Sequence, residues 1–442
     1  MSRVLRNYAG FTIACIVGVA FVLIFAASST SFSSLTLILA FFTFASVIAA
    51  AMLIAWAAEA SQYSISQGLA LAVVAIVQTL PEFFVEGAIA WNAGKDPVGW
   101  LPNVTANFTG ANRLLTGLGW PLILFTAMLS RSGNKRSGLH VIAMRKEQSI
   151  EVVFMLGATL YYVLIWLRGS LELIDTFVLL AVFLGYLWML SRLPSERQDP
   201  REALDASPRA IVELRTRKHR IIAILGLFSF SGLVFVFIST PFVDSINTIA
   251  VALFGAGAGF FFIQWIAPFL SEFPEKVTAF HWARKINLAP MALLNFVSSA
   301  VNELTALVAI IPIIFALSIG SIGPVSLTAH RDEVLLTMAQ SLYACVCLMD
   351  LEYDVRNALF LFGLWLVSTA FVETRFAISI IFILASLVEL IIQRGRITVF
   401  ASFKQTLRQY FSRHSRWPRT TSPRSLIINV KGPTFSLIDH FS

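Results

Sequence analysis

The sequence has few of the residues on which soluble and secreted proteins rely. Only 13% of its 442 residues are charged, and it has three cysteines and six histidines. All three cysteines lie within apolar segments, so no disulfide framework is indicated. Cys345 and Cys347 are two positions apart on a predicted helix and point in different directions, which argues against a metal-binding pair.

Several classes of enzyme and binding protein are not indicated either. The histidines are scattered through loops and the tail, where they form neither a zinc nor a haem pattern. We find no spaced set of nucleophile, histidine and acid, and no glycine-rich phosphate loop, so we expect no enzymatic activity and no cofactor. The net charge of +8 comes from segments between apolar runs, so nucleic acid is not an expected partner.

Apolar residues are abundant instead. They make up 57% of the chain, and the mean hydropathy is +0.77, far above that of a soluble domain. Runs of roughly 17 to 25 apolar residues, each long enough to cross a bilayer as a helix, recur along the chain. The sequence therefore predicts an all-α polytopic membrane protein with about twelve crossings. They are expected near residues 11–27, 35–58, 68–91, 104–129, 151–167, 172–191, 221–240, 249–271, 288–317, 333–350, 356–372 and 375–392.

The basic residues gather in four segments between these runs. They lie within 131–146, 215–220 and 284–285 and in the tail after Arg394. Counting helices places all four on one side, which the positive-inside rule makes the cytoplasm. We therefore expect a multi-pass protein of the cell (inner) membrane. Both termini would be cytoplasmic if residues 1–30 are an uncleaved helix; a signal peptide is the alternative, and the length of the apolar run favours the helix.

Residues 192–220 are the only sizeable polar break before the tail, and their mixture of proline, acidic and basic residues indicates a solvated cytoplasmic linker. In the tail, Phe400, Phe403, Leu407 and Phe411 recur at helical spacing, either along the inner leaflet or in a solvated segment. The expected regions are an N-terminal helix or signal-like segment (1–30), a first repeat (31–191), the linker (192–220), a second repeat with an extra C-terminal helix (221–392) and a basic cytoplasmic tail (393–442).

Ionisable residues occur where the chain is otherwise apolar. Residues 267–282, APFLSEFPEKVTAFHW, contain Glu272, Glu275 and Lys276, and charges inside a bilayer are costly unless they serve a function. Pro274 has no N–H to donate, so it bends the helix and frees the carbonyl of Leu270. A free carbonyl beside a carboxylate is the outline of a site for a hard cation.

The same pattern occurs earlier, in QTLPEFFVEGAIAW, where Pro81 precedes Glu82 and frees the carbonyl of Val77. Each Pro-Glu is followed by a helix with a polar patch. Asn112 and Asn302 stand at nearly equal intervals after Glu82 and Glu275. The two Pro-Glu segments are an odd number of predicted crossings apart and so run in opposite directions. We therefore expect an inverted repeat of about five helices each, with a site at the midplane.

Other ionisable residues stand near these motifs. Arg113 needs a buried partner, and we expect Glu86 to supply it. Lys276 lies one turn after Glu272 and is placed to neutralise it. Glu303 follows Asn302 directly and is a further candidate for the ion pathway.

These features together resemble the cation/calcium exchanger superfamily, in particular bacterial sodium/calcium antiporters. The resemblance covers residues 78–126 and 270–315, and TGANRLLTGLGWP and LSEFPEKVTAFHWARK carry it most clearly. It departs from the family pattern before Pro-Glu, where neither copy keeps a glycine and Glu272 replaces an expected serine. The resemblance implies that Glu82 and Glu275 are the metal-binding carboxylates, helped by polar side chains at Thr79, Asn112, Ser271, Ser299 and Asn302.

The resemblance predicts a secondary active antiporter that exchanges Ca²⁺ for Na⁺ by alternating access. Inorganic cations and the lipid bilayer are the expected partners. Two carboxylates balance one calcium ion, and sodium ions or protons must replace it before the helices move. A proton-coupled antiporter of calcium or another cation stays open, with Glu86, Glu272 and Glu303 as additional acids. A membrane scaffold or sensor, with the acids in structural ion pairs, is the remaining alternative.

Overall fold

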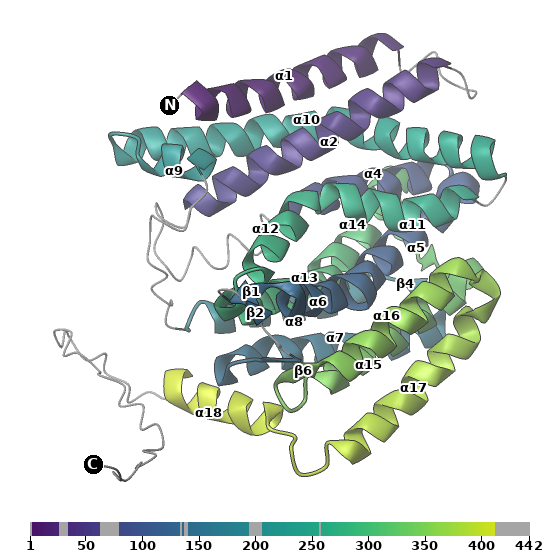
Figure 1. The fold of residues 1–442 in the computed structure, drawn as a ribbon. Coiled ribbons are helices and arrows are strands. Elements are labelled where there is room, and N and C mark those ends of the chain that lie inside the picture. The colour runs from purple at the N-terminus through teal and green to yellow at the C-terminus, as the bar shows by residue number, and fades with distance from the viewer. Residues whose placement is uncertain are drawn as a thin grey trace, which may run out of the picture.

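The structure is a computed structural model that describes residues 2–25, 34–61, 79–132, 135–136, 140–193, 206–255 and 258–411. The described part of the chain is built almost entirely of helices (Figure 1). The first half contains α1 (Ser2–Phe25), α2 (Ser34–Ser61), α4 (Leu80–Lys95), α5 (Pro97–Leu114), the π-helix η2 (Leu115–Gly119), α6 (Trp120–Leu129), α7 (Ser149–Arg168) and α8 (Leu173–Leu190).

The second half contains a comparable series. It comprises α9 (Ala206–Val212), α10 (Arg217–Phe254), α11 (Ala258–Ser271), α12 (Phe273–Ala283), α13 (Ala289–Asn302), the π-helix η5 (Glu303–Leu307), α14 (Val308–Ile319), α15 (Arg331–Cys347), α16 (Val355–Ala370), α17 (Arg375–Ile392) and α18 (Val399–Phe411). Four 3-10 turns, η3 (Lys146–Gln148), η4 (Ile286–Leu288), η6 (Thr328–His330) and η7 (Val372–Thr374), precede α7, α13, α15 and α17.

Seven of the described helical segments are long and apolar enough to cross a membrane, judged by length and composition. Large apolar side chains such as Leu164 on α7, Phe177 on α8 and Leu384 on α17 are more than half exposed, as expected for surfaces that face lipid. The predicted all-α membrane class is confirmed. The figure of about twelve crossings stays a prediction.

The predicted break between the helices at 221–240 and 249–271 is misplaced, because the first helix ends at Phe254 and the second, α11, begins at Ala258. The helix α10 runs without a break from Arg217 to Phe254 and contains Pro241 in its interior. The hydroxyl of Ser245 donates to the carbonyl of Pro241 at 2.7 Å. Packing of α10 along α2 holds the proline within a helix that, at about 1.5 Å per residue, is much longer than a bilayer core is thick.

Two small strand pairs relate the two halves. Strand β3 (Val141–Ala143), before α7, pairs antiparallel with β6 (Glu352–Asp354), after α15. Strand β5 (Val325–Ser326), before α15, pairs antiparallel with β4 (Ser170–Leu171), after α7. The strand before α7 corresponds to the strand before α15, and the strand after α7 corresponds to the strand after α15. The two pairs are therefore equivalent under an exchange of the two halves, and they lie at opposite ends of α7 (Figure 1). This arrangement agrees with an inverted repeat. A third pair joins β1 (Arg131–Ser132) to β2 (Lys135–Arg136).

Both Pro-Glu motifs stand at the start of a helix. The helix α11 ends at Ser271 and α12 begins at Phe273. The helical path is therefore interrupted at Glu272, where the sequence predicted only a bend. In the first half, α4 begins at Leu80 with Pro81 in its first turn, a position that needs no N–H donor. The predicted free carbonyl of Val77 lies outside the described residues.

The helices α1, α2 and α10 pack together along one side of the molecule (Figure 1). The short helix α9 docks on this group: Ile211 and Val212 are buried there, and the hydroxyl of Tyr8 donates to the carbonyl of Ser207 at 3.0 Å. Residues 206–212 of the predicted linker are therefore partly buried rather than solvated. Residues 194–205 lie outside the described part of the chain.

The start of the tail forms α18, which packs against α7 and η3. Phe403 and Leu407 lie on its packed side, as the predicted stripe requires, but Phe400 is about half exposed because Val399, Ser402 and Thr406 occupy the buried face. Beyond α18, residues 412–442 of the tail lie outside the described chain.

Candidate cation site

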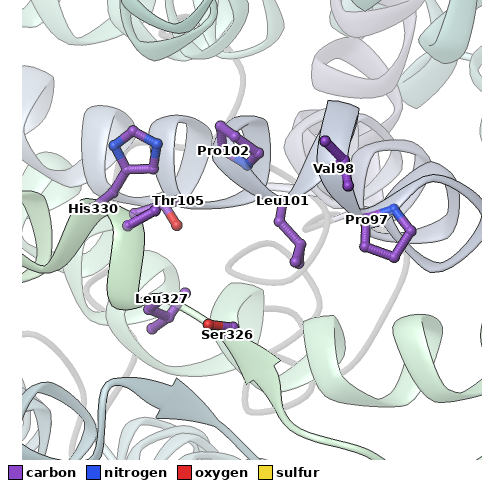
Figure 2. Close-up of a pocket in the computed structure, with 9 residues that line it drawn as sticks. Pro97, Val98, Leu101, Pro102, Thr105, Ser326, Leu327 and His330 are labelled. Carbon is purple, nitrogen blue, oxygen red and sulfur yellow. The ribbon is translucent and has the colours of Figure 1, made fainter.

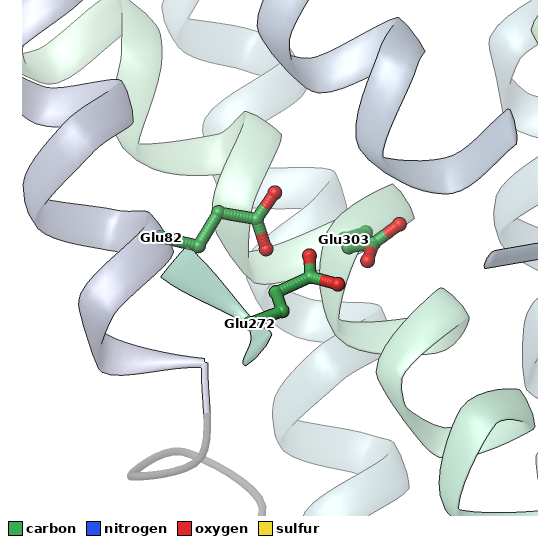
Figure 3. A group of neighbouring side chains, drawn as sticks. All are labelled: Glu82, Glu272 and Glu303. Carbon is green, nitrogen blue, oxygen red and sulfur yellow. The ribbon is translucent and has the colours of Figure 1, made fainter. Parts of the chain in front are cut away.

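Three buried glutamates meet inside the helix bundle (Figure 3). Glu82, Glu272 and Glu303 are each at most 2% exposed, and each offers a carboxylate oxygen within 4.8 Å of the others. Three negative charges this close in a low-dielectric interior require positive charge or protons among them. The group therefore has the charge and the oxygen atoms of a cation site.

Local structure explains why these three carboxylates meet. Glu82 lies in the first turn of α4, where the partial positive charge of a helix N-terminus stabilises a carboxylate. Glu272 occupies the break after α11, whose C-terminal carbonyls carry the partial negative charge that suits a cation. Glu303 opens the π-helix η5, and π-turns of this kind are frequent at functional sites.

Most oxygens of these carboxylates have no hydrogen-bond donor among the described residues. This holds for both oxygens of Glu82, both of Glu303 and Oε1 of Glu272. Buried polar atoms in proteins almost always have a partner, so unpartnered carboxylate oxygens that converge on one point fit a bound cation. Carboxylate oxygens are the ligands that calcium prefers.

One fixed positive charge lies at the edge of the group. The ammonium of Lys276 donates to Oε2 of Glu272, and both side chains are buried. The predicted pair one helical turn apart is confirmed. Lys276 also lies within electrostatic range of Glu275 and Glu303, so it acts on more than its direct partner.

Glu275, the other predicted metal-binding carboxylate, is not among the three. Its Oε1 accepts hydrogen bonds from Nδ2 of Asn295, at 2.8 Å, and from the hydroxyl of Ser299. Sequence reasoning singled out Ser299 and missed Asn295. The signal was available, because Asn295 stands one helical turn before Ser299 on the polar face of α13.

The remaining predicted ligands divide into two pairs. Thr79 and Asn302 are buried and flank the group along the chain: the carbonyl of Thr79 accepts from the N–H of Glu82 at 3.1 Å, and Asn302 precedes Glu303. Asn112 and Ser271 use their side chains in other hydrogen bonds. Oδ1 of Asn112 accepts from Ser341 at 2.6 Å, and the hydroxyl of Ser271 donates to the carbonyl of Ala267 at 3.0 Å.

The predicted ion pair of Glu86 with Arg113 is wrong. Oε2 of Glu86 accepts from Nδ2 of Asn107 at 2.6 Å, because Asn107 is the residue of α5 that faces Glu86. The guanidinium of Arg113, which is fully buried, pairs with Glu333 on α15. Glu333 also pairs with Arg375 on α17, so one carboxylate serves two arginines.

A pocket of about 170 Å³ lies between the start of α5 and the η6 turn (Figure 2). Its lining holds no carboxylate, so it does not offer the ligands of a calcium site. The residues around it are Pro97, Val98, Leu101, Pro102, Thr105, Ser326, Leu327, Ala329 and His330.

Comparisons with known proteins agree with this architecture. The sequence profile of the family described as sodium/calcium exchanger protein matches residues 33–192. A crystal structure of the H⁺/Ca²⁺ exchanger CAX is 30% identical, with a TM-score of 0.78 over 92% of this chain and 99% of that chain. The structure of native YfkE is 16% identical, with a TM-score of 0.54 over 85% and 99%, and shares the fold. No curated protein sequence matches the chain. The profile match and the similarity to CAX together show that this chain belongs to the cation/calcium exchanger superfamily.

Proposed function

We propose that this protein exchanges calcium ions for protons by alternating access, with Glu82, Glu272 and Glu303 as the cation-binding carboxylates. The broader statement comes from its family: the protein is a multi-pass membrane cation antiporter and not an enzyme. The observation that carries the calcium assignment is the convergence of three buried carboxylates whose oxygens lack donors. Hard divalent cations bind such oxygens, and calcium accepts six to eight of them in flexible geometry.

The other predicted ligands take supporting positions in this proposal. Thr79 and Asn302 are buried and stand close to the carboxylates along the chain, three residues before Glu82 and directly before Glu303, so they are the candidates for neutral oxygen ligands. Glu275, in the first turn of α12, forms with Ser299 a neighbouring station that a cation reaches when the broken helix moves. Asn112 and Ser271 would act in another conformation, because their side chains are engaged elsewhere in this one.

Two observations favour protons as the counter-ion. Carboxylates this close together repel each other once calcium leaves, and protons neutralise them without needing further ligands. CAX, at 30% identity over 99% of its length, is an H⁺/Ca²⁺ exchanger. Sodium is the second candidate, because the family profile that matches residues 33–192 is described as sodium/calcium exchanger protein.

The distribution of basic residues supports an orientation in the cell membrane. The segments that carry them include β1, β2 and the start of α10, and these lie at the same end of the molecule as α18 (Figure 1). We assign this end, and both termini, to the cytoplasm.

Calcium-45 uptake into proteoliposomes of the purified protein tests the proposal. Acid-loaded vesicles are compared with sodium-loaded vesicles. We expect uptake with acid inside, and its loss by more than about 100-fold in Glu82→Gln, since even outer partners of metal ligands are worth about 10–100-fold. Glu213→Gln removes an exposed acid and serves as the matched control.

Three results would contradict parts of the proposal. Uptake that requires internal sodium would make sodium the counter-ion. Uptake that survives in Glu82→Gln would remove this carboxylate from the site. No uptake with either gradient, from folded wild-type protein, would end the calcium assignment.

A further inference from the structure

We propose that Glu86 and Asn107 form an outer station, which binds calcium between the central site and the extracellular side of the membrane. The central site is the group of three carboxylates, Glu82, Glu272 and Glu303. The inference deepens the proposed function and rests on it, because it assigns side chains to one of the two routes by which calcium reaches that site.

The carboxylate of Glu86 is buried without a counter-charge. The residue is fully buried, and none of the ion pairs among the described residues includes it. Arg113, the arginine expected to pair with it, binds Glu333 instead. Oε2 of Glu86 accepts from Asn107, while Oε1 has no donor among the described residues. An acid held in this way inside a membrane protein indicates a functional site.

Asn107 offers a second oxygen at the same place. It is fully buried, and its Nδ2 is engaged with Glu86 at 2.6 Å. Its Oδ1 has no donor in the described part of the chain. Buried polar atoms almost always have a partner, so two unpartnered oxygens on neighbouring side chains fit a bound cation. Carboxylate and amide oxygens are both ligands for calcium.

The second half of the chain has the same arrangement. Oε1 of Glu275 accepts from Nδ2 of Asn295 at 2.8 Å, and Oε2 of Glu275 has no donor among the described residues. In each half, therefore, an acid three or four residues after a central carboxylate is held by an asparagine of the next helix and keeps one oxygen free. Corresponding positions of an inverted repeat serve opposite sides of the membrane.

The two helices that carry these acids lead to opposite ends of the molecule. The helix α4 leads to the end where β4 and β5 pair: the hydroxyl of Ser318 on α14, the helix before β5, donates to the carbonyl of Trp91 on α4. The helix α12 leads to the other end, because α13, which returns from there to Glu303, contacts β3. We have assigned the end that carries α18 and β3 to the cytoplasm, so Glu86 lies on the extracellular side.

The outer station is placed to pass a cation to the central site. Glu86 follows Glu82 by one helical turn, which is about 6 Å along the axis of α4. On α5, Asn103 lies one turn nearer the extracellular end than Asn107, on the same face, and it is buried as well. Polar side chains thus continue from the central site toward the start of α5, and a cation reaches them when the bundle opens to that side.

A purely structural role for Glu86 predicts different behaviour. In that case the carboxylate only ties α4 to α5 by accepting from Asn107. Glu86→Gln keeps an acceptor oxygen for this bond and removes the charge, so a structural role predicts no effect on calcium transport that depends on the side of the membrane. A cation station predicts weaker calcium binding from the extracellular side alone.

Calcium-45 uptake into membrane vesicles of opposite orientation separates these cases. Right-side-out vesicles present the extracellular face of the protein to added calcium, and everted vesicles present the cytoplasmic face. Both are loaded with acid, or with sodium if sodium is the counter-ion, and assayed at one external pH. Uptake by vesicles from cells without the protein is subtracted, and the initial rates give the KM for calcium at each face.

For Glu86→Gln we expect KM to rise about 10–100-fold at the extracellular face, as when a supporting group of a metal site is lost, and to stay at the wild-type value at the cytoplasmic face. Glu275→Gln should show the opposite asymmetry. Glu373→Gln removes an exposed glutamate between α16 and α17, at the extracellular end, and as a matched control should equal wild type at both faces.

Several results would overturn the inference. They are a KM of Glu86→Gln that is unchanged at both faces, one that is raised equally at both, and the same asymmetry in Glu86→Gln and Glu275→Gln. Asn107→Ala covers the case in which Glu86→Gln does not fold: it should raise KM at the extracellular face only, and an equal or absent change would also overturn the inference. Failure of the proposed function would appear instead in the wild-type protein, as the absence of calcium uptake with either gradient.

Discussion

Replacing Glu333 with glutamine is expected to destabilise the protein, because this carboxylate is shared by two buried arginines. Oε2 of Glu333 pairs with Arg113 and Oε1 with Arg375. The side chain of Arg113 is fully buried, and those of Arg375 and Glu333 are 3% and 5% exposed. Gln264 completes the network by donating to Oε2 at 2.9 Å. The glutamine variant would keep two positive charges here with no negative charge between them.

The size of the effect follows from the burial of both pairs. Breaking one buried ion pair by removing a partner costs about 3–5 kcal/mol. Glutamine retains one acceptor oxygen, so some hydrogen bonding survives and we expect a value within this range although two pairs are affected. With an unfolding entropy of about 2.1 cal/mol/K per residue over the whole chain, this loss lowers Tm by about 3–6 °C.

Thermal unfolding in detergent, followed by tryptophan fluorescence and by size exclusion, measures the shift. Glu373→Gln removes an exposed acid near the start of α17 and should leave Tm within about 1 °C of wild type, as surface substitutions usually do. If Glu333→Gln unfolds at the same temperature as Glu373→Gln, the two arginines do not depend on this carboxylate and the reasoning is refuted.

Two further predictions concern the contact of α5 with α11 and the η6 turn. A Cβ added at Gly110 would lie 1.9 Å from the carbonyl oxygen of Gln264, so Gly110→Ala must separate α5 from α11 and should lower both Tm and transport. In contrast, Gly226→Ala meets nothing within 4 Å and should change neither. Burial, and to a lesser extent Arg375, lower the pKa of His330 below its ordinary value of 6.5. The unfolded chain then binds more protons than the folded protein below about pH 6.5, so stability falls on acidification. The decrease in Tm between about pH 7 and pH 5 should therefore be smaller in His330→Gln than in wild type.

The sequence predicted the membrane class and singled out the buried acids of the candidate site, although it paired Glu82 with Glu275 rather than with Glu272 and Glu303, because charge is costly in an apolar chain. Buried acids at Glu82, Glu272 and Glu303 stood out against long apolar runs, and the prolines marked the helix starts beside the first two. The pair of Glu272 with Lys276 followed from helical spacing alone. These are local signals, and they needed no knowledge of the tertiary structure.

The partners of Arg113 and Glu86 could not be predicted in the same way. Glu333 lies 220 residues from Arg113, and Arg375 joins from a third helix. Both Glu333 and Arg375 stand at the edges of predicted apolar runs, where charged residues are common and do not indicate a buried ion pair. Glu86 was closer in sequence, but the face that α4 presents to α5 meets Asn107. Which side chains pair across two helices depends on how each helix is rotated about its own axis relative to its neighbour. The periodicity of the sequence does not give this relative rotation.

In helix α10, a local sequence signal for a break was present but was overridden by packing in the structure. Pro241 follows directly after residue 240, where the sequence predicted the end of a helix. In the structure the segment is helical and packs along α2, with Ser245 bonded to the carbonyl of Pro241. Local propensity is weak where a long helix has a partner of matching length to pack against.

The two Pro-Glu motifs are alike in sequence but unequal in the site. In the first half, the glutamate of the Pro-Glu motif, Glu82, belongs to the group of three carboxylates. In the second half, the corresponding glutamate, Glu275, accepts hydrogen bonds from neutral donors instead. Of the two acids that flank Pro274 there, Glu272 is the one that belongs to the group. Glu272 is also where the sequence departs from the family pattern, and Lys276 follows it by one turn. The acid adds one negative charge and the lysine adds one positive charge, so the net charge of the site is the same with both as with neither. Under the proposed function, this balance leaves the charge available to one divalent cation unchanged, which accounts for the occurrence of the two residues together.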